Sequence, residues 1–243
     1  MDGLLILSIE TATSCGSVSL STGGIQDFQL LTECIAQPDI THSRRLMGSV
    51  DWVMQTAGVS WENLDGIGVS IGPGSFTGLR IGLAAAKAIA MATGKPLVGV
   101  STLASLALAC LGICDERLVG VLLDARKKEV YAGFYRFNAS GEPVQTGNPV
   151  VIPPNELLQT INEPVTLVGP GVKAYMDVFG NHEHVTIFPD ALSLPRAAYV
   201  GMLASKMLVD GMIMEPSSAA PLYVRASEAE LSLNKKKRLH VKK

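Results

Sequence analysis

The segment GPGSFTGLRIG, Gly72 to Gly82, decides how the rest of the chain is interpreted. An apolar strand pattern, LDGIGVSI, comes before it and a long apolar run follows it. A strand, a glycine turn and a helix in this order leave free backbone amides at the helix start, where an anion can bind. The segment lacks the lysine of a Walker A loop, and Thr77 stands where a Rossmann fingerprint needs its third glycine. Without a standard nucleotide fingerprint, the segment is either a helix start whose amides bind an anion or a tight turn that allows close packing.

The predicted helix after this turn carries a small-residue pattern. Gly78, Gly82, Ala86 and Ala90 recur every four residues, so they line one helical face with almost no side chain. Such a face lets another element of structure approach closely. The pattern leaves open whether that element belongs to this chain or to a partner.

The segments on either side of the turn predict two lobes of similar order. The first 35 residues alternate apolar and polar positions between glycines, which indicates three antiparallel strands. From Ser43 the apolar period becomes helical, and Gly58 ends a helix of about four turns. With the strand and helix around the glycine turn, the order is βββαβα. Similar strand patterns return after residue 117, and a last helix is expected from Pro195 to Asp210, followed by an extended segment from Ala219 to Arg225.

Composition excludes several classes of protein. Only 17% of the 243 residues are charged and the net charge is −2, so no global charge attracts nucleic acid. Six of the nine residues in 235–243, KKKRLHVKK, are basic, while acidic residues outnumber basic ones in the rest of the chain.

The uncharged stretch 96–114 contains serine, threonine and glycine, which favours a buried strand and helix over a membrane span. The N-terminus lacks the basic region of a signal peptide.

The four cysteines have neither zinc-ribbon nor redox spacing. They are expected to be buried thiols in a reducing cytosol.

Five blocks, in order, resemble the TsaB (YeaZ) family: ILSIETATSCGSVSL, THSRRL, GPGSFTGLRIGLAAAK, DARKKEVYAGFY and PLYVRASEAE. The resemblance implies an α/β fold of the actin-like, sugar kinase and Hsp70 nucleotide-binding class, with two βββαβα-type lobes around a degenerate cleft. The lobes are expected at residues 1–101 and 102–226, with a basic tail at 227–243. The resemblance also implies a role in the threonylcarbamoyl (t6A) modification of adenosine 37 in tRNAs that read ANN codons.

The resemblance further implies that the chemistry belongs to a catalytic paralogue, TsaD, which holds a metal between two histidines four residues apart on a helix. Thr102 and Leu106 stand at those positions here, and neither side chain can replace an imidazole. The four histidines include no pair with that spacing, and no nucleophile elbow occurs. We therefore expect no catalytic residue, no metal and no cofactor.

Five residues are the candidates for a degenerate nucleotide cleft. Glu10 and Thr11 stand where the superfamily places an acid and a hydroxyl in the first hairpin. Asp124 stands in the second hairpin, which lacks a glycine two residues later to let a phosphate approach the backbone. Gly169 and Gly171 are either a remnant of the adenosine turn or an ordinary strand-to-helix turn.

The leading hypothesis is a non-catalytic scaffold or activating subunit, located in the cytoplasm, that binds TsaD through the helices after Ser43 and after Thr77. It would form a homodimer when alone and would meet a TsaE-type ATPase and the tRNA only in the assembled complex. Arg80 is either solvated or a ligand for an anion or a partner's acid. The predicted interface residues are Leu46, Val50, Val53, Gly78, Gly82, Leu83, Ala86 and Ala90.

The alternative is a metal-dependent peptidase or an ATP-dependent enzyme of the same superfamily. Either activity would require a histidine pair or an intact second phosphate loop, and neither is found in the sequence.

Overall fold

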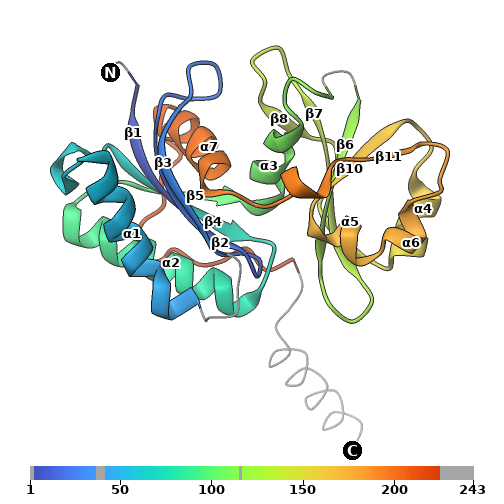
Figure 1. Cartoon of the computed structure of the whole chain (residues 1–243), viewed down its shortest axis with the longest axis horizontal. Helices are drawn as coiled ribbons and strands as arrows, with labels where there is room; N and C mark the ends of the chain where they lie inside the picture. The colour runs from blue at the N-terminus through green and yellow to red at the C-terminus, as the bar shows by residue number, and fades with distance from the viewer. Residues whose placement is uncertain (1–2, 37–41, 115–116, 225–243) are drawn as a thin grey trace, which may run out of the picture.

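The computed structural model describes residues 3–36, 42–114 and 117–224. They form two lobes, each built on one β-sheet, which lie side by side in Figure 1. The predicted basic tail, 227–243, falls outside the described residues.

The sheet of the first lobe has five strands in the order β3-β2-β1-β4-β5. β1 (Leu5–Glu10), β2 (Gly16–Thr22) and β3 (Gln29–Ala36) are antiparallel neighbours. β4 (Gly66–Gly72) and β5 (Leu97–Ser101) continue the sheet in parallel with β1. The three predicted antiparallel strands and the predicted strand before the glycine turn are confirmed.

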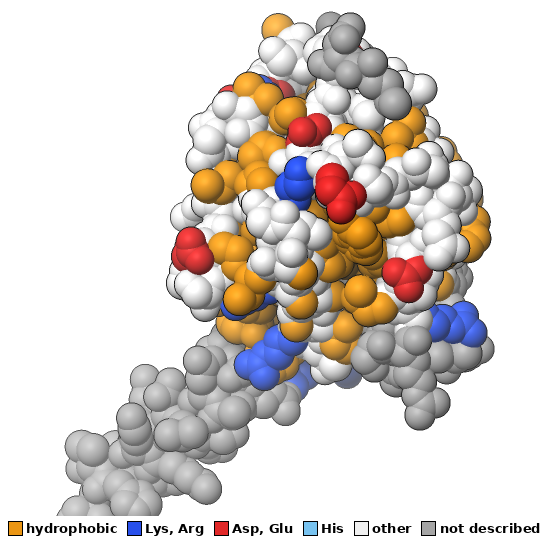
Figure 2. All heavy atoms as spheres, turned by 90° about the vertical axis from the view of Figure 1, so that its left-hand side faces the viewer, with side chains coloured by type: hydrophobic (Ala, Val, Ile, Leu, Met, Phe, Trp, Pro, Cys, Tyr) orange, Lys and Arg blue, Asp and Glu red, His pale blue; other side chains and the backbone are white. Residues whose placement is uncertain are grey.

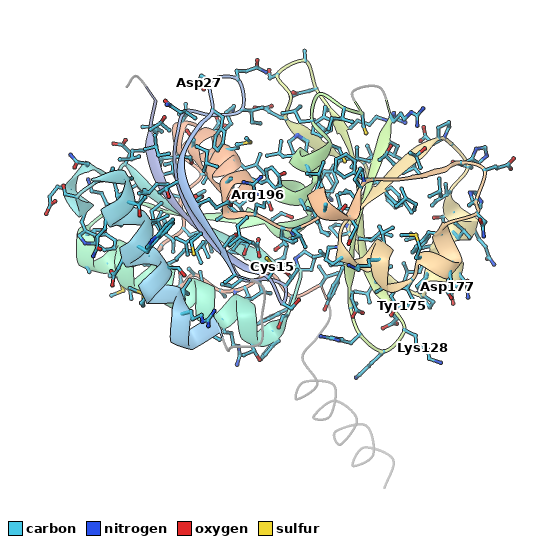
Figure 3. All side chains as sticks on the ribbon, viewed as in Figure 1. Cys15, Asp27, Lys128, Tyr175, Asp177 and Arg196 are labelled. Atoms are coloured by element: carbon cyan, nitrogen blue, oxygen red, sulfur yellow. The ribbon has the colours of Figure 1, made fainter. Side chains whose placement is uncertain are left out.

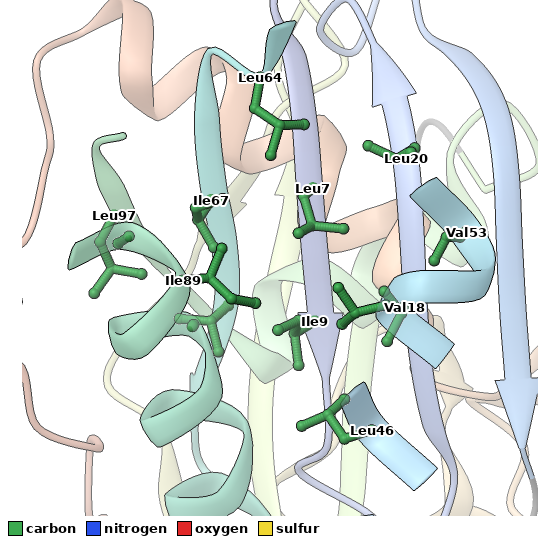
Figure 4. Packing of buried hydrophobic residues seen from close by; sticks show 14 of the residues in the cluster. Leu7, Ile9, Val18, Leu20, Leu46, Val53, Leu64, Ile67, Ile89 and Leu97 are labelled. Carbon is green, nitrogen blue, oxygen red and sulfur yellow. The ribbon is translucent and has the colours of Figure 1, made fainter. Parts of the chain in front are cut away.

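Two long helices, α1 (His42–Ala57) and α2 (Phe76–Thr93), cover one face of this sheet. Gly58 and Gly94 follow them with φ values of +64° and +67°, so both glycines end their helices in the left-handed conformation, and the predicted helix end at Gly58 is confirmed. The apolar side chains of the two helices and of the sheet interlock in the largest core cluster of the described residues, part of which is shown in Figure 4.

The second lobe contains a six-stranded sheet in the order β11-β10-β6-β7-β8, with β9 paired to β7. Its parallel pairs are β6 with β10 and β10 with β11. The strands β8 and β11 are short and were not predicted. The strands are β6 (Leu118–Asp124), β7 (Val130–Phe137), β8 (Pro143–Gln145), β9 (Val150–Ile152), β10 (Val165–Val168) and β11 (Val185–Ile187). The helices are α4 (Pro154–Thr160), α5 (Pro170–Ala174) and α6 (Met176–Phe179).

The uncharged stretch 96–114 joins the lobes. It forms β5, then α3 (Thr102–Ala107) and a short 3-10 turn (Leu108–Cys110). The Ser101 side chain accepts a hydrogen bond from the Ala104 N–H and caps α3. No helix among the described residues is long and apolar enough to cross a bilayer.

The last helix, α7 (Ala197–Val209), corrects the predicted lobe boundary. Residues 102–226 were assigned to the second lobe, but α7 packs on β1, β2 and β4 of the first sheet. A Cβ added to Gly201 would lie 2.5 Å from Ser21 Oγ, and one added to Gly68 would lie 2.8 Å from the Ala204 side chain. Small residues on both surfaces let this helix approach the sheet, and the sequence does not show which sheet it covers.

The start of α7 is held by polar groups of the first sheet. Ser17 Oγ accepts from the Ala197 N–H at 2.7 Å, and Glu33 Oε1 accepts from the Ala198 N–H at 3.1 Å. Arg196, labelled between the lobes in Figure 3, pairs with the same buried Glu33 carboxylate. These contacts join α7 to the first lobe.

The chain then returns to the helix after the glycine turn. The Leu222 N–H donates to the Ile71 carbonyl at 2.7 Å, so the described part of the expected extended segment lies along β4. The Tyr223 ring stacks on Phe76 with a centroid distance of 5.0 Å, and Arg80 Nε donates to the Tyr223 hydroxyl at 3.1 Å. Arg80 therefore has a partner within the chain.

Candidate nucleotide cleft and partner surface

Glu10, at the end of β1, is fully buried. Its Oε1 accepts from the Ala12 N–H at 2.5 Å, while Oε2 has no hydrogen-bond partner among the described residues. Burial raises the pKa of Glu10 to about 7, and the Ala12 N–H and the nearby Ser70 hydroxyl act in the opposite direction. A divalent cation needs an ionised carboxylate ligand. A carboxyl that is half protonated near neutrality and closed off from solvent fits that role poorly.

The hydroxyl of Thr11 is used to hold α2. Thr11 Oγ1 donates to the Gly78 carbonyl at 2.8 Å, and both residues are buried. A Cβ added to Gly78 would lie 2.0 Å from the Thr11 carbonyl oxygen, and one added to Gly82 would lie 2.1 Å from Thr11 Oγ1. The glycines therefore let the helix touch the end of β1, and Thr11 faces that helix instead of a ligand.

Asp124, at the end of β6, shapes the β6–β7 hairpin. Its Oδ1 accepts from the Arg126 N–H at 2.8 Å, and its Oδ2 lies 3.6 Å from a guanidinium nitrogen of the same residue. Arg126, Lys127 and Lys128 have φ values of +61°, +53° and +63°. Left-handed backbone costs a non-glycine residue about 1–2 kcal/mol. The carboxylate thus stabilises a strained turn of three successive cationic residues.

The GPG turn of the second lobe is a packing feature. Gly169 has a φ of +111°, and a Cβ there would lie 2.4 Å from the Leu122 carbonyl oxygen. A Cβ on Gly171 would lie 2.8 Å from the Leu122 carbonyl carbon. Both glycines let the start of α5 touch β6, so the strand-to-helix interpretation of this turn fits the geometry.

Two pockets formed by described residues lie away from these five positions. One, of about 420 Å³, lies between the β2–β3 and β7–β8 hairpins, and the other, of about 320 Å³, lies at the end of α1. Asp27, which lines the first pocket, is labelled near the top of Figure 3, whereas Lys128 is labelled near the bottom. The five candidate residues do not fit a nucleotide with its metal ion, because each is committed to the chain's own packing or turns.

The described residues include no cluster of histidine, cysteine or acidic side chains suited to a metal ion. Thr102 and Leu106 are both fully buried on α3. The four cysteines are free thiols, three of them buried as predicted, while Cys34 is only partly buried.

Comparison with known proteins connects this geometry to a family. Residues 36–233 match the family described as TsaD, tRNA N6-adenosine threonylcarbamoyltransferase. The chain is 29% identical over 229 residues to the tRNA threonylcarbamoyladenosine biosynthesis protein TsaB of Escherichia coli (strain K12), which covers 92% of this chain and 96% of the relative. It is 28% identical over 234 residues to TsaB of Bacillus subtilis (strain 168), with coverage of 93% and 96%.

The solved structure of YeaZ from Pseudomonas aeruginosa matches 90% of this chain and 99% of its own, with a TM-score of 0.77 and 28% identity. The chain belongs to the TsaB (YeaZ) family. The predicted family is confirmed, and so is the predicted α/β fold with two lobes, each built on one sheet.

In this TsaB-family chain the predicted partner residues are buried within the chain itself. Leu46, Val50, Val53 and Leu83 belong to the core beneath α1 and α2, as do Ala86 and Ala90. Gly78 and Gly82 contact Thr11. The prediction that these eight side chains supply a partner's contact area is therefore wrong for this fold, because the small-residue face of α2 is turned toward β1.

A second ridge on α2 faces outward in this TsaB-family fold. Arg80, Ala84, Ala88 and Ala92 are exposed and also recur every four residues. Met91 on the same helix is 69% exposed, and Trp52 on α1, which packs against α2, is 50% exposed. Figure 2 shows hydrophobic side chains spread over this side of the molecule. We define the outer helix face as Met47, Trp52, Ala84, Ala88 and Met91.

Sequence reasoning missed this ridge although its signal was present. The residues at 84, 88 and 92 have the same spacing as those at 82, 86 and 90, so periodicity alone does not separate them. The two Gly–Thr11 contacts decide which ridge is buried.

Proposed function

We propose that this chain is a non-catalytic scaffold or activating subunit for the threonylcarbamoyl modification of adenosine 37 in tRNA. Its outer helix face would dock on a catalytic paralogue of the TsaD type. The observation that carries the proposal is this exposed apolar surface in a chain whose relatives are named tRNA threonylcarbamoyladenosine biosynthesis proteins. Exposed apolar side chains on two neighbouring helices are typical of protein contacts.

The candidate cleft supports an accessory role. Glu10 is closed off from solvent, and Asp124 is engaged by the backbone of its own hairpin. Thr102 and Leu106 stand where the family resemblance implies metal-binding histidines in the catalytic paralogue. No observation on the described residues favours the alternative of a peptidase or an ATP-dependent enzyme.

The same surface would also allow the chain to associate with itself. In the absence of the paralogue, two copies would cover their outer helix faces by pairing with each other, because an isologous contact needs only one self-complementary patch. The TsaE-type ATPase and the tRNA would join the assembled complex in the cytoplasm.

Ala88→Arg tests the docking surface. Ala88 is exposed in the middle of the outer helix face, so a guanidinium there would disrupt a close contact without disturbing the core. We expect roughly 100-fold weaker association with the TsaD-type paralogue, measured by calorimetry. Reconstituted tRNA modification should fall in parallel.

Ile213→Arg is the matched control, since Ile213 is 60% exposed and lies outside the outer helix face. This control should associate normally. Wild-type association by Ala88→Arg would exclude the proposed surface, and turnover by the isolated chain would contradict the accessory role.

A further inference from the structure

The β6–β7 hairpin contains the longest run of basic residues in the part of the chain that the structure describes, Arg126–Lys128. All three residues are exposed, and the Arg126 side chain is 85% exposed. These cations lie on the second lobe, while the outer helix face lies on the first (Figure 1). A paralogue docked on the outer helix face would therefore leave the hairpin uncovered.

Three hydrogen bonds hold the backbone of this hairpin. The Ala125 N–H donates to the Glu129 carbonyl at 2.9 Å, and the Glu129 N–H donates to the Arg126 carbonyl at 3.0 Å. The Asp124 carboxylate accepts from the Arg126 N–H inside the same turn. All three basic residues have positive φ, although glycine or asparagine would adopt this backbone more readily. Such strain is concentrated at functional sites, and burial does not explain it here because the side chains are exposed.

The hairpin also lies at the edge of the sheet where ligands bind in α/β folds. β6 and β10 are parallel neighbours, so Asp124 and the turn after β10 lie at the same carboxyl edge. Tyr175 is close enough to Asp124 for that carboxylate to contribute to the raised pKa of the phenol, although burial is the larger cause. Figure 3 shows Tyr175, Asp177 and Lys128 at this end of the second lobe. An aromatic ring beside exposed cations is a common arrangement in nucleic-acid contacts.

The shape of this surface favours a chain of phosphates over a single nucleotide. Three successive cations on an exposed hairpin match charges spread along a sugar-phosphate backbone. Among the described acids near the hairpin, Asp124 accepts from the Arg126 N–H inside the turn, and Glu129 and Asp177 would weaken the attraction.

We propose that Arg126, Lys127 and Lys128, with Tyr175 beside them, bind backbone phosphates of the tRNA in the assembled complex. This inference rests on the proposed function, because the RNA would be presented by the complex and not by this chain alone. The contact is independent of base sequence and sensitive to salt.

The test is the double variant Lys127→Asn, Lys128→Asn, which removes two charges and keeps residues that tolerate positive φ. The probe is a tRNA transcript with unmodified adenosine 37, titrated at several salt concentrations into the complex with the TsaD-type paralogue. We expect roughly tenfold weaker binding at moderate salt and a salt slope reduced by about two. Assembly with the paralogue should be unchanged.

The double variant Arg136→Asn, Lys206→Asn is the matched control, because it removes two exposed cations from elsewhere and should leave the salt slope nearly unchanged. A second variant, Lys127→Gly, Lys128→Gly, removes the same charges while relieving the backbone. It should show the same loss of tRNA affinity even if the asparagine variant folds poorly.

Three outcomes separate the proposals. An unchanged tRNA affinity and salt slope in both hairpin variants would overturn the RNA contact. A loss of assembly instead of tRNA affinity would identify the hairpin as a protein contact and would also overturn it. Failure of the wild-type chain to bind the paralogue would overturn the proposed function itself.

Discussion

β1 and β6 occupy corresponding places in the two lobes, and each ends in a carboxylate at a hairpin. Glu10 is fully buried with a pKa raised to about 7, whereas the Asp124 side chain is 31% exposed and holds a turn of three cations. The strand ends have similar glycine contacts, because Gly82 meets β1 and Gly171 meets β6. The repeated order of elements therefore preserves the packing of helix on strand but not the chemical environment of the acid.

Gly82→Leu should have the largest effect on stability, because it disrupts the close packing of α2 on the end of β1. Its Cβ would lie 2.1 Å from the buried Thr11 hydroxyl, and neither α2 nor β1 can move without opening the core. We expect a loss of more than about 4 kcal/mol in the free energy of unfolding, measured in urea. Because this substitution disrupts folding, it cannot test partner binding.

Gly48→Ala is the control for Gly82→Leu, since a Cβ at this position in α1 meets nothing within 4 Å. It should stabilise the chain by roughly 0.5–1 kcal/mol. Near-native stability of Gly82→Leu would mean that α2 does not touch β1 as described.

Glu10→Gln should remove the pH dependence of stability that the buried Glu10 carboxyl causes. The pKa of Glu10 rises from 4.5 in the unfolded chain to about 7 in the folded one, so between these values the folded state binds more protons. Wild-type stability should therefore fall as pH rises from about 4.5 to 7, by about 3 kcal/mol in total. The glutamine variant lacks this loss, so its advantage over wild type should grow with pH in urea titrations from pH 5 to pH 8.

Asp124→Asn is the matched substitution in the second lobe. It should loosen the β6–β7 hairpin, because the Asp124 carboxylate accepts from the Arg126 N–H. Parallel pH profiles of stability for wild type and Glu10→Gln would show that Glu10 is solvated.

Gly171→Ala should have a smaller effect than Gly82→Leu. The added methyl would lie 2.8 Å from the backbone of β6, but α5 is short and can shift. We expect a loss of about 2 kcal/mol in the free energy of unfolding, measured in urea. A neutral result would show that the GPG turn is loosely packed and would reopen its assignment as a ligand turn.

Much of the fold could be predicted because its signals are local. Alternating polar and apolar residues identified the meander, and Gly58 and Gly94 mark the ends of α1 and α2. The three-residue strands β8 and β11 have too few residues to show a period. The position of α7 on the first sheet depends on long-range fits such as Gly201 against Ser21, which no local pattern contains.

The candidate site was less predictable than the fold. The residue types at Glu10, Asp124 and Gly169 were identified from the family resemblance, but their roles depend on burial and on neighbouring backbone groups. The unusual conformation of the DARKK hairpin could not be predicted, because arginine and lysine have no preference for positive φ.

The amino-acid sequence alone determined the order of the longer elements, the family and the presence of a four-residue ridge on α2. Only the tertiary structure decided which of two equally spaced ridges is buried, because the residues at 82 and 84 differ in environment through contacts with Thr11, more than 60 positions away in the chain. Helical periodicity is set by neighbouring residues, whereas burial is set by the partner surface that the whole fold brings into contact.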